Sequence, residues 1–435
     1  MNYSESLDYL FGLQRLGARL GTDVVTELLA RMGDPQGSFP SVLVAGTNGK
    51  GSTAAFLDSV LRCAGLRTGL YTSPHLVRFE ERIAVDGGTI PPEEVARIAT
   101  LLREQADGMV GRGGEARRPS FFETATAMAL RHFQDRRVDM AVLEVGLGGR
   151  LDATSVVDAV TCLFTPIDLD HQEWLGPDRD SIGREKAGIF RSGRAAVFGG
   201  DDPPAGLVEH ADRLGARLLL AGRDFKVRLR DGDWDWEGLG RQRLGLPLPA
   251  LRGTFQVRNA AAAIATLEAV SDRLSLSTVA LREGLLGVRL PGRFEVFPGP
   301  ITLIFDVAHN PEAARGLAEN LARHAAEGGR TLAVFSMLRD KDIAGVARVL
   351  APQISEWFYA PLEAQRAATG EQLGAALDAA GLGAVAHGHA DLLAALAAAG
   401  AAARHGDRIL VFGSFYTVSL LLPLARAAAG APAGR

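Results

Sequence analysis

The stretch VAGTNGKGST, residues 44 to 53, joins a strand-like run to a helix-like run through three glycines and a lysine. SVLVAG is a β-branched apolar run typical of a buried parallel strand, and TAAFLDSVLRCAG carries apolar residues at helical spacing. A standard phosphate loop reads G-x-x-x-x-G-K-[ST]. In this chain Val44 occupies the leading glycine position, and Gly51 separates Lys50 from Ser52.

This turn still predicts a phosphate site. Its backbone N–H groups and the positive end of the following helix would face an anion. Lys50 adds a positive charge, and Ser52 or Thr53 offers a hydroxyl to Mg²⁺. The alternative is a glycine-rich strand-to-helix turn that carries an exposed lysine.

Composition narrows the class of protein. A chain of 435 residues is longer than a domain with a single hydrophobic core usually is, so two domains are expected. The formal charge of -4, without a long Lys/Arg block, argues against a nucleic-acid partner. The alanine-rich stretches near the C-terminus are shorter than the ~18 residues of a membrane span. Cys63 and Cys162 form no C-x-x-C motif, and the N-terminus lacks a signal-peptide pattern. We therefore expect reduced, buried thiols in a cytoplasmic protein.

Strand-like and helix-like segments alternate along most of the chain, which predicts an α/β fold with a mainly parallel sheet covered by helices on both faces. Helices are expected over about residues 92–105 and 121–135. Residues 224–252 break the alternation, because FKVRLRDGDWDWEG indicates a hairpin around an Asp-Gly turn. A second strand–helix series begins at ITLIFDVAHN, so the domain boundary is expected between about residues 288 and 298.

Polar residues that follow strands are the candidates for a metal site, since ligands in such folds bind beyond the carboxyl ends of the strands. Glu144 ends an apolar strand, where it could hold Mg²⁺ or pair with an arginine. His171 follows another strand, among Asp168, Asp170 and Glu173. One imidazole among many oxygen ligands favours Mg²⁺ over zinc.

Two further residues lie near these strand ends in the sequence. Ser73, in YTSPHL, could offer a hydroxyl to the metal. Lys186, in SIGREKAGIF, would be repelled by a cation unless its charge is changed. The residues alone therefore favour a surface position for Lys186.

Other segments suggest substrate contacts. Arg78 or Arg82 could clamp a carboxylate bidentately. Phe121 and Phe122 precede Glu123 at a helix start, which suits a flat, hydrogen-bonding heterocycle, although aromatic core packing is an equal alternative.

The second domain carries its own polar cluster after a strand. In IFDVAHNPEAA, Asp306 ends the strand, His309 and Asn310 follow, and Pro311 opens a helix. Arg293, in the segment between the domains, could reach a nucleotide phosphate when the domains close.

Eight motifs in chain order resemble the folylpolyglutamate synthase and dihydrofolate synthase family, a branch of the Mur-ligase-like amide ligases. They are GTNGKGS, YTSPHL, FFE, LEVGLGGRLDAT, DHQEWLG, REKAGIF, LPGRFE and DVAHNP, and they span nearly the whole chain. G-T-N-G-K-G-[ST] is this family's own form of the phosphate loop. The resemblance implies a P-loop ATPase domain that also binds folate at 1–290 and a smaller, Rossmann-like glutamate-ligase α/β domain at 291–435.

The resemblance also implies an activity. The family uses ATP to phosphorylate a substrate carboxylate, and the α-amine of L-glutamate then attacks the acyl phosphate. Catalysis would be mostly positioning and charge neutralisation. The implied cofactors are ATP and two Mg²⁺ ions, with a monovalent cation as a further candidate. The implied substrates are L-glutamate and a reduced folate or dihydropteroate, and we expect a monomer.

Matching motifs assign roles to individual residues. Lys50, Lys186, His171, Asp306 and His309 would be catalytic. Ser73 and Glu144 would hold one Mg²⁺, and His171 with Lys186 as a carbamate would hold the second. The nucleotide would contact Thr47, Asn48, Gly49, Lys50, Gly51, Ser52, Thr53, Asn259, Arg293 and Asp306. The other substrates would contact Arg82, Phe122, Glu123, Asp152, His309 and Ser414.

One stretch departs from the family pattern. Members that accept dihydropteroate can carry Ile-Asp-Leu-Gly where residues 18–21 of this chain read ARLG. The GREKAGIFRSG and DHQEWLGPDR segments nevertheless resemble bifunctional bacterial members, so both activities are expected. The competing hypotheses are a ligase for UDP-muramyl precursors and a P-loop nucleotide switch without ligation.

Overall fold

The structure is a computed structural model that describes residues 1–17, 19–272, 274–324, 329–364 and 366–430. Residue 18 of the ARLG stretch therefore lies outside the described residues. The chain divides into two compact units: residues 1–250 with 256–289, and residues 251–255 with 290–435.

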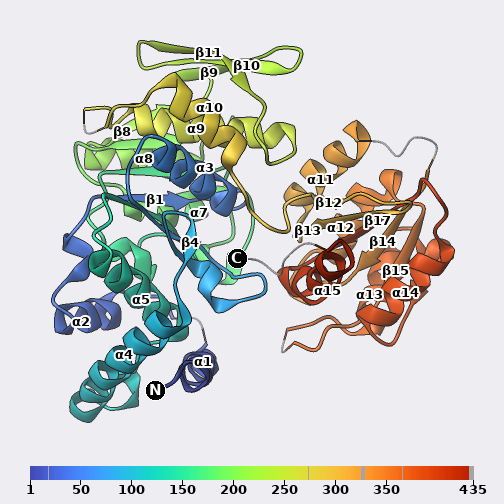
Figure 1. Ribbon diagram of the computed structural model, residues 1–435, viewed down its shortest axis with the longest axis horizontal. Helices are drawn as coiled ribbons and strands as arrows, with labels where there is room; N and C mark the ends of the chain where they lie inside the picture. The colour runs from blue at the N-terminus through green and yellow to red at the C-terminus, as the bar shows by residue number, and fades with distance from the viewer. Residues whose placement is uncertain (18, 273, 325–328, 365, 431–435) are drawn as a thin grey trace. The chain divides into compact units, whose positions relative to one another are not determined.

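The first unit is built around an eight-stranded sheet (Figure 1). Its order is β4-β3-β2-β5-β1-β6-β7-β8, and only β3 and β4 run antiparallel to their neighbours. The strands are β1 (Ser41–Ala45), β2 (Thr68–Tyr71), β3 (Ile83–Val85), β4 (Gly88–Thr89), β5 (Met140–Glu144), β6 (Thr161–Phe164), β7 (Ala195–Phe198) and β8 (Arg217–Leu220). The predicted mainly parallel sheet is confirmed.

Helices cover both faces of this sheet. They are α1 (Tyr3–Gly12), α2 (Asp23–Arg31), α3 (Lys50–Cys63), α4 (Pro92–Gly113), α5 (Phe121–Asp135), α6 (Gln172–Leu175), α7 (Arg179–Lys186), α8 (Ala205–Leu214), α9 (Thr254–Glu268) and α10 (Thr278–Gly287). In Figure 1, α3, α9 and α10 lie on one side of the sheet, and α2, α4 and α5 lie on the other. Every residue of β1 is buried, as the apolar run SVLVA requires for a strand covered on both faces.

The bounds of α5 agree with the prediction, and those of α4 do not. α5 spans residues 121–135 as expected, and Ser120 caps it by accepting the N–H of Glu123. α4 was predicted to end near residue 105, which is wrong, because it continues to Gly113. Ala106 and Met109 prolong its buried face, and this packing outweighs the cost of glycine in the last turns.

The predicted hairpin is present and forms part of a three-stranded sheet. β9 (Phe225–Leu229) and β10 (Asp233–Gly238) pair antiparallel around the Asp-Gly turn. A third strand, β11 (Arg241–Pro247), pairs with β10 and was not predicted. Trp234 and Trp236 of the central strand are fully buried, which anchors this small sheet.

The second unit holds a six-stranded sheet of order β12-β13-β17-β14-β15-β16, parallel except for β12. Its strands are β12 (Glu295–Phe297), β13 (Thr302–Asp306), β14 (Thr331–Phe335), β15 (Glu356–Tyr359), β16 (Ala386–Gly388) and β17 (Arg408–Phe412). Its helices are α11 (Pro311–Arg323), α12 (Ile343–Leu350), α13 (Gly370–Ala379), α14 (Leu392–Ala402) and α15 (Phe415–Ala428). The second α/β unit expected from the strand–helix series is thus present.

Two features bear on the predictions from composition. Cys162 is buried as expected, but the prediction for Cys63 is wrong, because that thiol is exposed at the last residue of α3. Within the described ranges, none of the helices is both long and apolar enough to span a membrane.

Candidate active site

The loop between β1 and α3 can be built only with glycine at two positions. Gly46 has φ +134°, and a Cβ there would lie 1.8 Å from Oγ1 of Thr165. Gly49 has φ +87°, and a Cβ there would lie 3.1 Å from the side-chain amide of Asn259. Both backbone conformations are ones that L side chains rarely adopt. The loop therefore packs tightly against its neighbours, with the N-terminus of α3 directly behind it.

Lys50, the first residue of α3, folds back over this loop. Its Nζ donates to the carbonyl of Thr47 at 2.9 Å and lies 3.4 Å from the carbonyl of Gly46. The hydroxyl of Thr53 is buried and donates to the carbonyl of Gly49 at 2.9 Å. Ser52 is buried as well. The positive charge of Lys50 is therefore held at the β1–α3 turn, where the sequence predicts a phosphate.

Asn259 lies beside the loop and is oriented by a residue that the sequence did not single out. Its Nδ2 donates to Oε1 of Gln256 at 3.1 Å, and Nε2 of Gln256 lies 3.4 Å from the hydroxyl of Ser52. Gln256 is buried. The only local signal for it is the spacing of three residues to Asn259, which places both on one face of α9.

The loop after β6 is tied to the phosphate loop through Thr47. The hydroxyl of Thr47 donates to the carbonyl of Asp168 at 3.1 Å and accepts from the N–H of Asp168 at 3.0 Å. The N–H of Thr47 donates to the carbonyl of Pro166 at 2.9 Å. Residues 121 positions apart in sequence are thus held together, and the loop that carries His171 is fixed beside Lys50's loop.

His171 sits at the start of α6 in a left-handed backbone conformation, with φ 53°. Its Nε2 lies 3.9 Å from Oδ2 of Asp170, and its side chain is 38% exposed. The imidazole is therefore accessible and lies next to a carboxylate at the carboxyl edge of the sheet.

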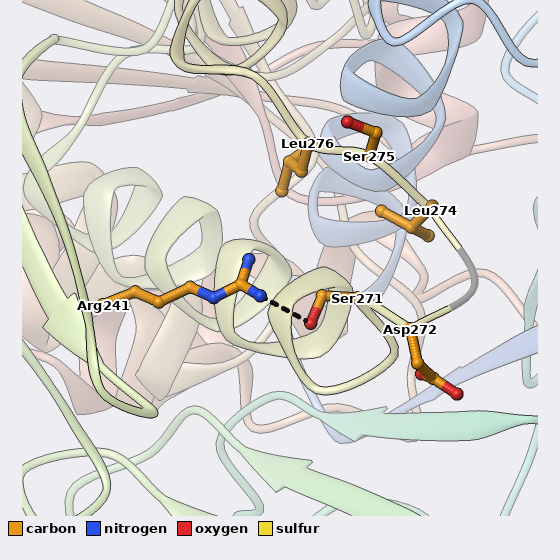
Figure 2. A pocket seen from close by; sticks show the side chains of 6 residues that line it. All are labelled: Arg241, Ser271, Asp272, Leu274, Ser275 and Leu276. Atoms are coloured by element: carbon orange, nitrogen blue, oxygen red, sulfur yellow. Dashed lines mark hydrogen bonds between the residues drawn. The ribbon is translucent and has the colours of Figure 1, made fainter.

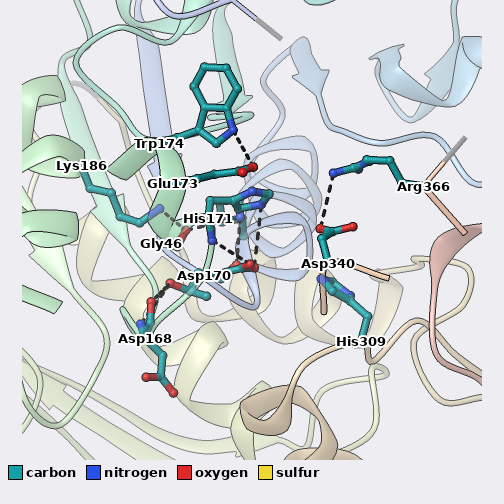
Figure 3. Close-up of polar contacts among 12 residues, drawn as sticks. Gly46, Asp168, Asp170, His171, Glu173, Trp174, Lys186, His309, Asp340 and Arg366 are labelled. Carbon is teal, nitrogen blue, oxygen red and sulfur yellow. Dashed lines mark hydrogen bonds and ion pairs between the residues drawn. The ribbon is translucent and has the colours of Figure 1, made fainter. Parts of the chain in front are cut away.

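Lys186 contradicts the surface position that the residues alone favoured. It is only 5% exposed, and its Nζ donates to the carbonyl of Gly46 at 2.8 Å (Figure 3). The backbone of Lys186 packs against Gly149, where a Cβ would lie 2.4 Å from the Lys186 carbonyl. Burial and the charge of Lys50 lower the pKa of Lys186 to about 7, opposed by Asp170 and Asp152. The carbonyl of Gly46 thus lies close to two lysines from distant parts of the chain.

Glu144 and Ser73 also meet at this edge. Glu144 pairs in register with Val44 of β1, so it lies directly beside the start of the phosphate loop. Its Oε2 accepts the N–H of Ser73 at 2.9 Å, and its side chain is buried. Carboxylate and hydroxyl oxygens are ligands that Mg²⁺ prefers. In the part of the chain that the structure describes, no three His, Cys, Asp or Glu side chains are grouped to hold a metal.

Phe122 and Asp152, both predicted to contact the heterocycle, lie at the loop that follows β5. Phe122 packs on Gly146, where a Cβ would lie 2.5 Å from its ring. Asp152 is buried and accepts the N–H groups of Leu147 and Thr154, each at 2.9 Å. Burial raises the pKa of the Asp152 carboxyl. These contacts fix the glycine-rich loop after β5.

Glu123 caps the N-terminus of α5. Its Oε2 accepts the N–H of Ser120 at 2.8 Å, which closes the capping box of α5. Its Oε1 is buried without a hydrogen-bond partner among the described residues. The pattern of Ser120 and Glu123 three residues apart is a recognisable capping signature that the sequence interpretation overlooked.

Four predicted residues gather within the second unit. Asp306 ends β13 and accepts the N–H groups of Phe294 at 2.9 Å and Ala308 at 2.8 Å. Burial raises the pKa of Asp306, against the opposing charge of Arg293. The Arg293 guanidinium lies 5.1 Å from the ring centre of Phe415, a contact that the sequence analysis missed.

His309 and Ser414 complete this second cluster. The His309 ring centre lies 6.2 Å from that of Phe415. Ser414 caps α15 and accepts the N–H of Thr417 at 3.0 Å. Because β13 and β17 are parallel neighbours, with Asp306 opposite Phe412, these residues share one carboxyl edge.

A hollow on the first unit lies elsewhere (Figure 2). It is lined by Arg241 of β11 and by the segment after α9, including Ser271 and Asp272. Arg241 donates to the hydroxyl of Ser271 at 3.1 Å. Asn259 lies nine positions before the last residue of α9, Glu268, which corresponds to roughly 14 Å of helix, and Ser271 lies beyond that end. The hollow is therefore separate from the phosphate loop.

Comparisons with known proteins show the family of the chain. Residues 292–415 match the family model described as "Mur ligase, glutamate ligase domain". The chain is 42% identical over 414 residues to the dihydrofolate synthase/folylpolyglutamate synthase of Escherichia coli K12, covering 95% of this chain and 93% of that protein.

Solved structures also match this chain, and two of those at 39% identity serve as examples. One is the Escherichia coli FolC in complex with DHPP and ADP, with a TM-score of 0.88 and coverage of 97% and 98% of the two chains. The other is the bifunctional folylpolyglutamate synthase/dihydrofolate synthase of Yersinia pestis complexed with AMPPNP and Mn ion, with a TM-score of 0.86 and coverage of 98% of both. The chain therefore belongs to the dihydrofolate synthase/folylpolyglutamate synthase family.

Proposed function

We propose that this protein is an ATP-dependent ligase that adds L-glutamate to the carboxylate of reduced folates and to that of dihydropteroate. The observation that carries this proposal is the meeting of three strand ends. β5, β1 and β6 are adjacent and parallel, so Glu144, the phosphate loop and the His171 loop share one edge. Lys186 of α7 reaches the same edge through its hydrogen bond to Gly46. This arrangement of a carboxylate, two lysines and an imidazole supports a site that binds and transfers a phosphate.

The chemistry explains why such a site is needed. A carboxylate is a poor electrophile, and a phosphoryl group supplies its leaving group. A substrate carboxylate oxygen bonds to the γ-phosphorus as ADP leaves. The α-amine of glutamate then bonds to the acyl carbon, phosphate leaves with the C–O bond electrons, and the amine loses a proton. Positioning and charge neutralisation supply most of the acceleration in such transfers.

The first unit would hold the nucleotide phosphates and the metal. Lys50 would exchange the carbonyls of Gly46 and Thr47 for phosphate oxygens, assisted by the N–H groups of residues 47–53 and by Asn259. Ser73 and Glu144 would hold one Mg²⁺, and His171 with Lys186 the second. Bound Mg²⁺ neutralises the charge that develops on the transferred phosphoryl group.

We propose that Lys186 acts as a carbamate. Its pKa of about 7 leaves a substantial neutral fraction near pH 7, and the neutral amine is the form that reacts with CO₂. The product replaces a buried cation by an anionic oxygen ligand, which also removes the repulsion from Lys50. The burial of Lys186 against Gly46 supports this assignment.

The remaining substrates would be held by two groups of residues. Arg82, Phe122, Glu123 and Asp152 would contact the folate or pteroate. In the second unit, His309 and Ser414 would contact glutamate, and Arg293 and Asp306 the nucleotide, with Asp306 and His309 among the catalytic groups. The ligase would divide into an ATP- and folate-binding domain at 1–290 and a glutamate-ligase domain at 291–435. It would act as a cytoplasmic monomer without a nucleic-acid or membrane partner, and a monovalent cation is a further candidate ligand.

Incubation with ATP, Mg²⁺ and glutamate tests the proposal when product masses are measured with tetrahydrofolate and with dihydropteroate in separate reactions. We expect glutamate-extended products from both acceptors. Product from UDP-muramyl precursors alone would favour the cell-wall ligase. Nucleotide binding without any extended product would favour the nucleotide switch.

A further inference from the structure

Arg82 is a buried arginine in an aromatic enclosure. It is 6% exposed, and its guanidinium carbon lies 5.0 Å from the ring centre of Phe121. Phe121 stacks on Phe11 of α1 at 5.9 Å, and Phe79 meets Phe121 edge-on at 6.1 Å. An arginine so enclosed loses most of its rotamer freedom, so its guanidinium plane is defined by its neighbours.

The sheet topology places Arg82 at the edge of the proposed active site. β3 runs antiparallel to β2, with Ile83 opposite Tyr71, and Tyr71 is in turn opposite Leu143 of β5. Arg82 immediately precedes β3, and Glu144 immediately follows Leu143. Both therefore lie at the carboxyl edge of β2 and β5. The charges of Arg82, Asp152 and Glu144 all act on the pKa of Tyr71, which agrees with this placement.

Arg82 makes a short hydrogen bond to His75. Nε of Arg82 donates to Nδ1 of His75 at 2.7 Å. Arginine has only donors, so Nδ1 must be the unprotonated acceptor and the ring proton of a neutral imidazole must be on Nε2.

The segment that carries His75 is fixed independently of Arg82's side chain. Glu81 accepts the N–H groups of Leu76, Val77 and Arg78 at 2.6 to 3.0 Å. The N–H of Thr72 donates to the carbonyl of Arg82 at 2.9 Å. The imidazole is therefore presented by a rigid turn, and it can act as a fixed reference for the guanidinium.

We propose that His75 is a positioning residue for the ligation, because its Nδ1 fixes the guanidinium plane in which Arg82 meets a carboxylate of the folate or pteroate substrate. The proposal rests on the proposed function, in which Arg82 binds that substrate. A planar guanidinium binds a carboxylate bidentately only within a narrow range of orientations, so a loss of orientation weakens substrate binding even when the charge remains.

Two substitutions separate this role from simple packing. His75→Asn keeps an acceptor near the position of Nδ1, whereas His75→Leu keeps the volume but removes the acceptor. We expect His75→Leu to raise KM for the folate substrate about tenfold or more, with KM for ATP changed less than about twofold. His75→Asn should restore KM to within about threefold of the wild-type value. Equal KM values for folate in the two variants would overturn the proposal.

A spectroscopic measurement on the unmodified protein covers the case in which His75→Leu does not fold. Nitrogen NMR of isotopically labelled histidine, assigned with His75→Asn, should show an unprotonated Nδ1 and a protonated Nε2 at neutral pH. The opposite tautomer or a doubly protonated ring would overturn the proposal. Arg82→Lys serves as the reference: an unchanged folate KM in that variant would refute the substrate role of Arg82, whatever the tautomer of His75.

Discussion

The amine of Lys186 lies 2.8 Å from the carbonyl oxygen of Gly46, and the amine of Lys50 lies 3.4 Å from the same oxygen. The chain has only four lysines, and two of them converge on one peptide group of the phosphate loop. Lys50 is the second cause, after burial, of the lowered pKa of Lys186, because nearby like charges disfavour each other. A phosphate or a carbamate would relieve that repulsion.

Lys186→Ala is expected to lower kcat/KM by roughly 100-fold or more, because the loss of a charged group at a phosphoryl-transfer site removes several kcal/mol of transition-state stabilisation. NMR of protein equilibrated with isotope-labelled bicarbonate should show a carbamate signal that the variant lacks. Lys226 is exposed on β9, and Lys226→Ala provides the matched control with unchanged turnover. Wild-type turnover in Lys186→Ala would refute the assignment.

Glu144→Gln separates charge from hydrogen bonding. The glutamine oxygen can still accept the N–H of Ser73, so the melting temperature should stay close to that of the wild type. Without the negative charge, kcat/KM should fall by roughly 100-fold, and half-saturation should need more Mg²⁺. Titration of the initial rate with Mg²⁺ measures both effects. An unchanged rate and Mg²⁺ requirement would exclude Glu144 as a metal ligand.

Gly46→Ala tests whether the phosphate loop depends on its close packing. The added methyl group would meet Oγ1 of Thr165 at 1.8 Å in a backbone conformation with φ +134°, so the loop must move. We expect ATP affinity to fall at least tenfold in isothermal titration, since the N–H groups would no longer converge. Gly65→Ala is the control: its φ is +87°, but nothing lies within 4 Å of the new Cβ. It should cost about 1 kcal/mol of stability and leave ATP binding intact.

His132 predicts how stability depends on pH. It is buried in α5, and burial lowers its pKa from 6.5 to about 4, against the opposing charge of Glu94. Between these values the unfolded state binds more protons, so the contribution of the neutral imidazole is complete above pH 6.5 and is lost as pH falls towards 4.

His132→Leu should therefore reduce the pH dependence of stability in that window. The slope of the free energy of unfolding should become shallower by up to about 1.4 kcal/mol per pH unit. Urea unfolding of both proteins at several pH values measures this difference. Parallel slopes for the two proteins would show that His132 is not held neutral by the fold.

The sequence predicted those parts of the site that follow from strand order. Glu144, His171 and the 44–53 turn each follow an apolar strand, and the rule for parallel sheets brings such ends together. The burial of Lys186 could not be predicted from the sequence, because the hydrophilic stretch RDSIGREK resembles a surface helix. Its burial depends on Gly149 and Gly46, both distant in sequence.

Non-local packing also explains the other differences. Gln256 carries no motif of its own, and it matters only because α9 lies against α3 and brings it to Ser52. The role of His75 could not be predicted from the Ser-Pro-His motif, because it depends on the contact with Arg82 that the fold creates. β11 was missed because RQRLGLP lacks regular alternation, although two tryptophans of β10 require a cover.

The central claim is that the triphosphate binds at the β1–α3 turn, with its metal on Glu144. A crystal structure with a non-hydrolysable ATP analogue and Mg²⁺ tests this most directly. The predicted result is a triphosphate bound by the N–H groups of residues 47–53, with Lys50 Nζ moved from the Thr47 carbonyl to a phosphate oxygen and a metal bound to Glu144. A triphosphate bound away from this turn, with Lys50 still on the Thr47 carbonyl, would contradict the mechanism.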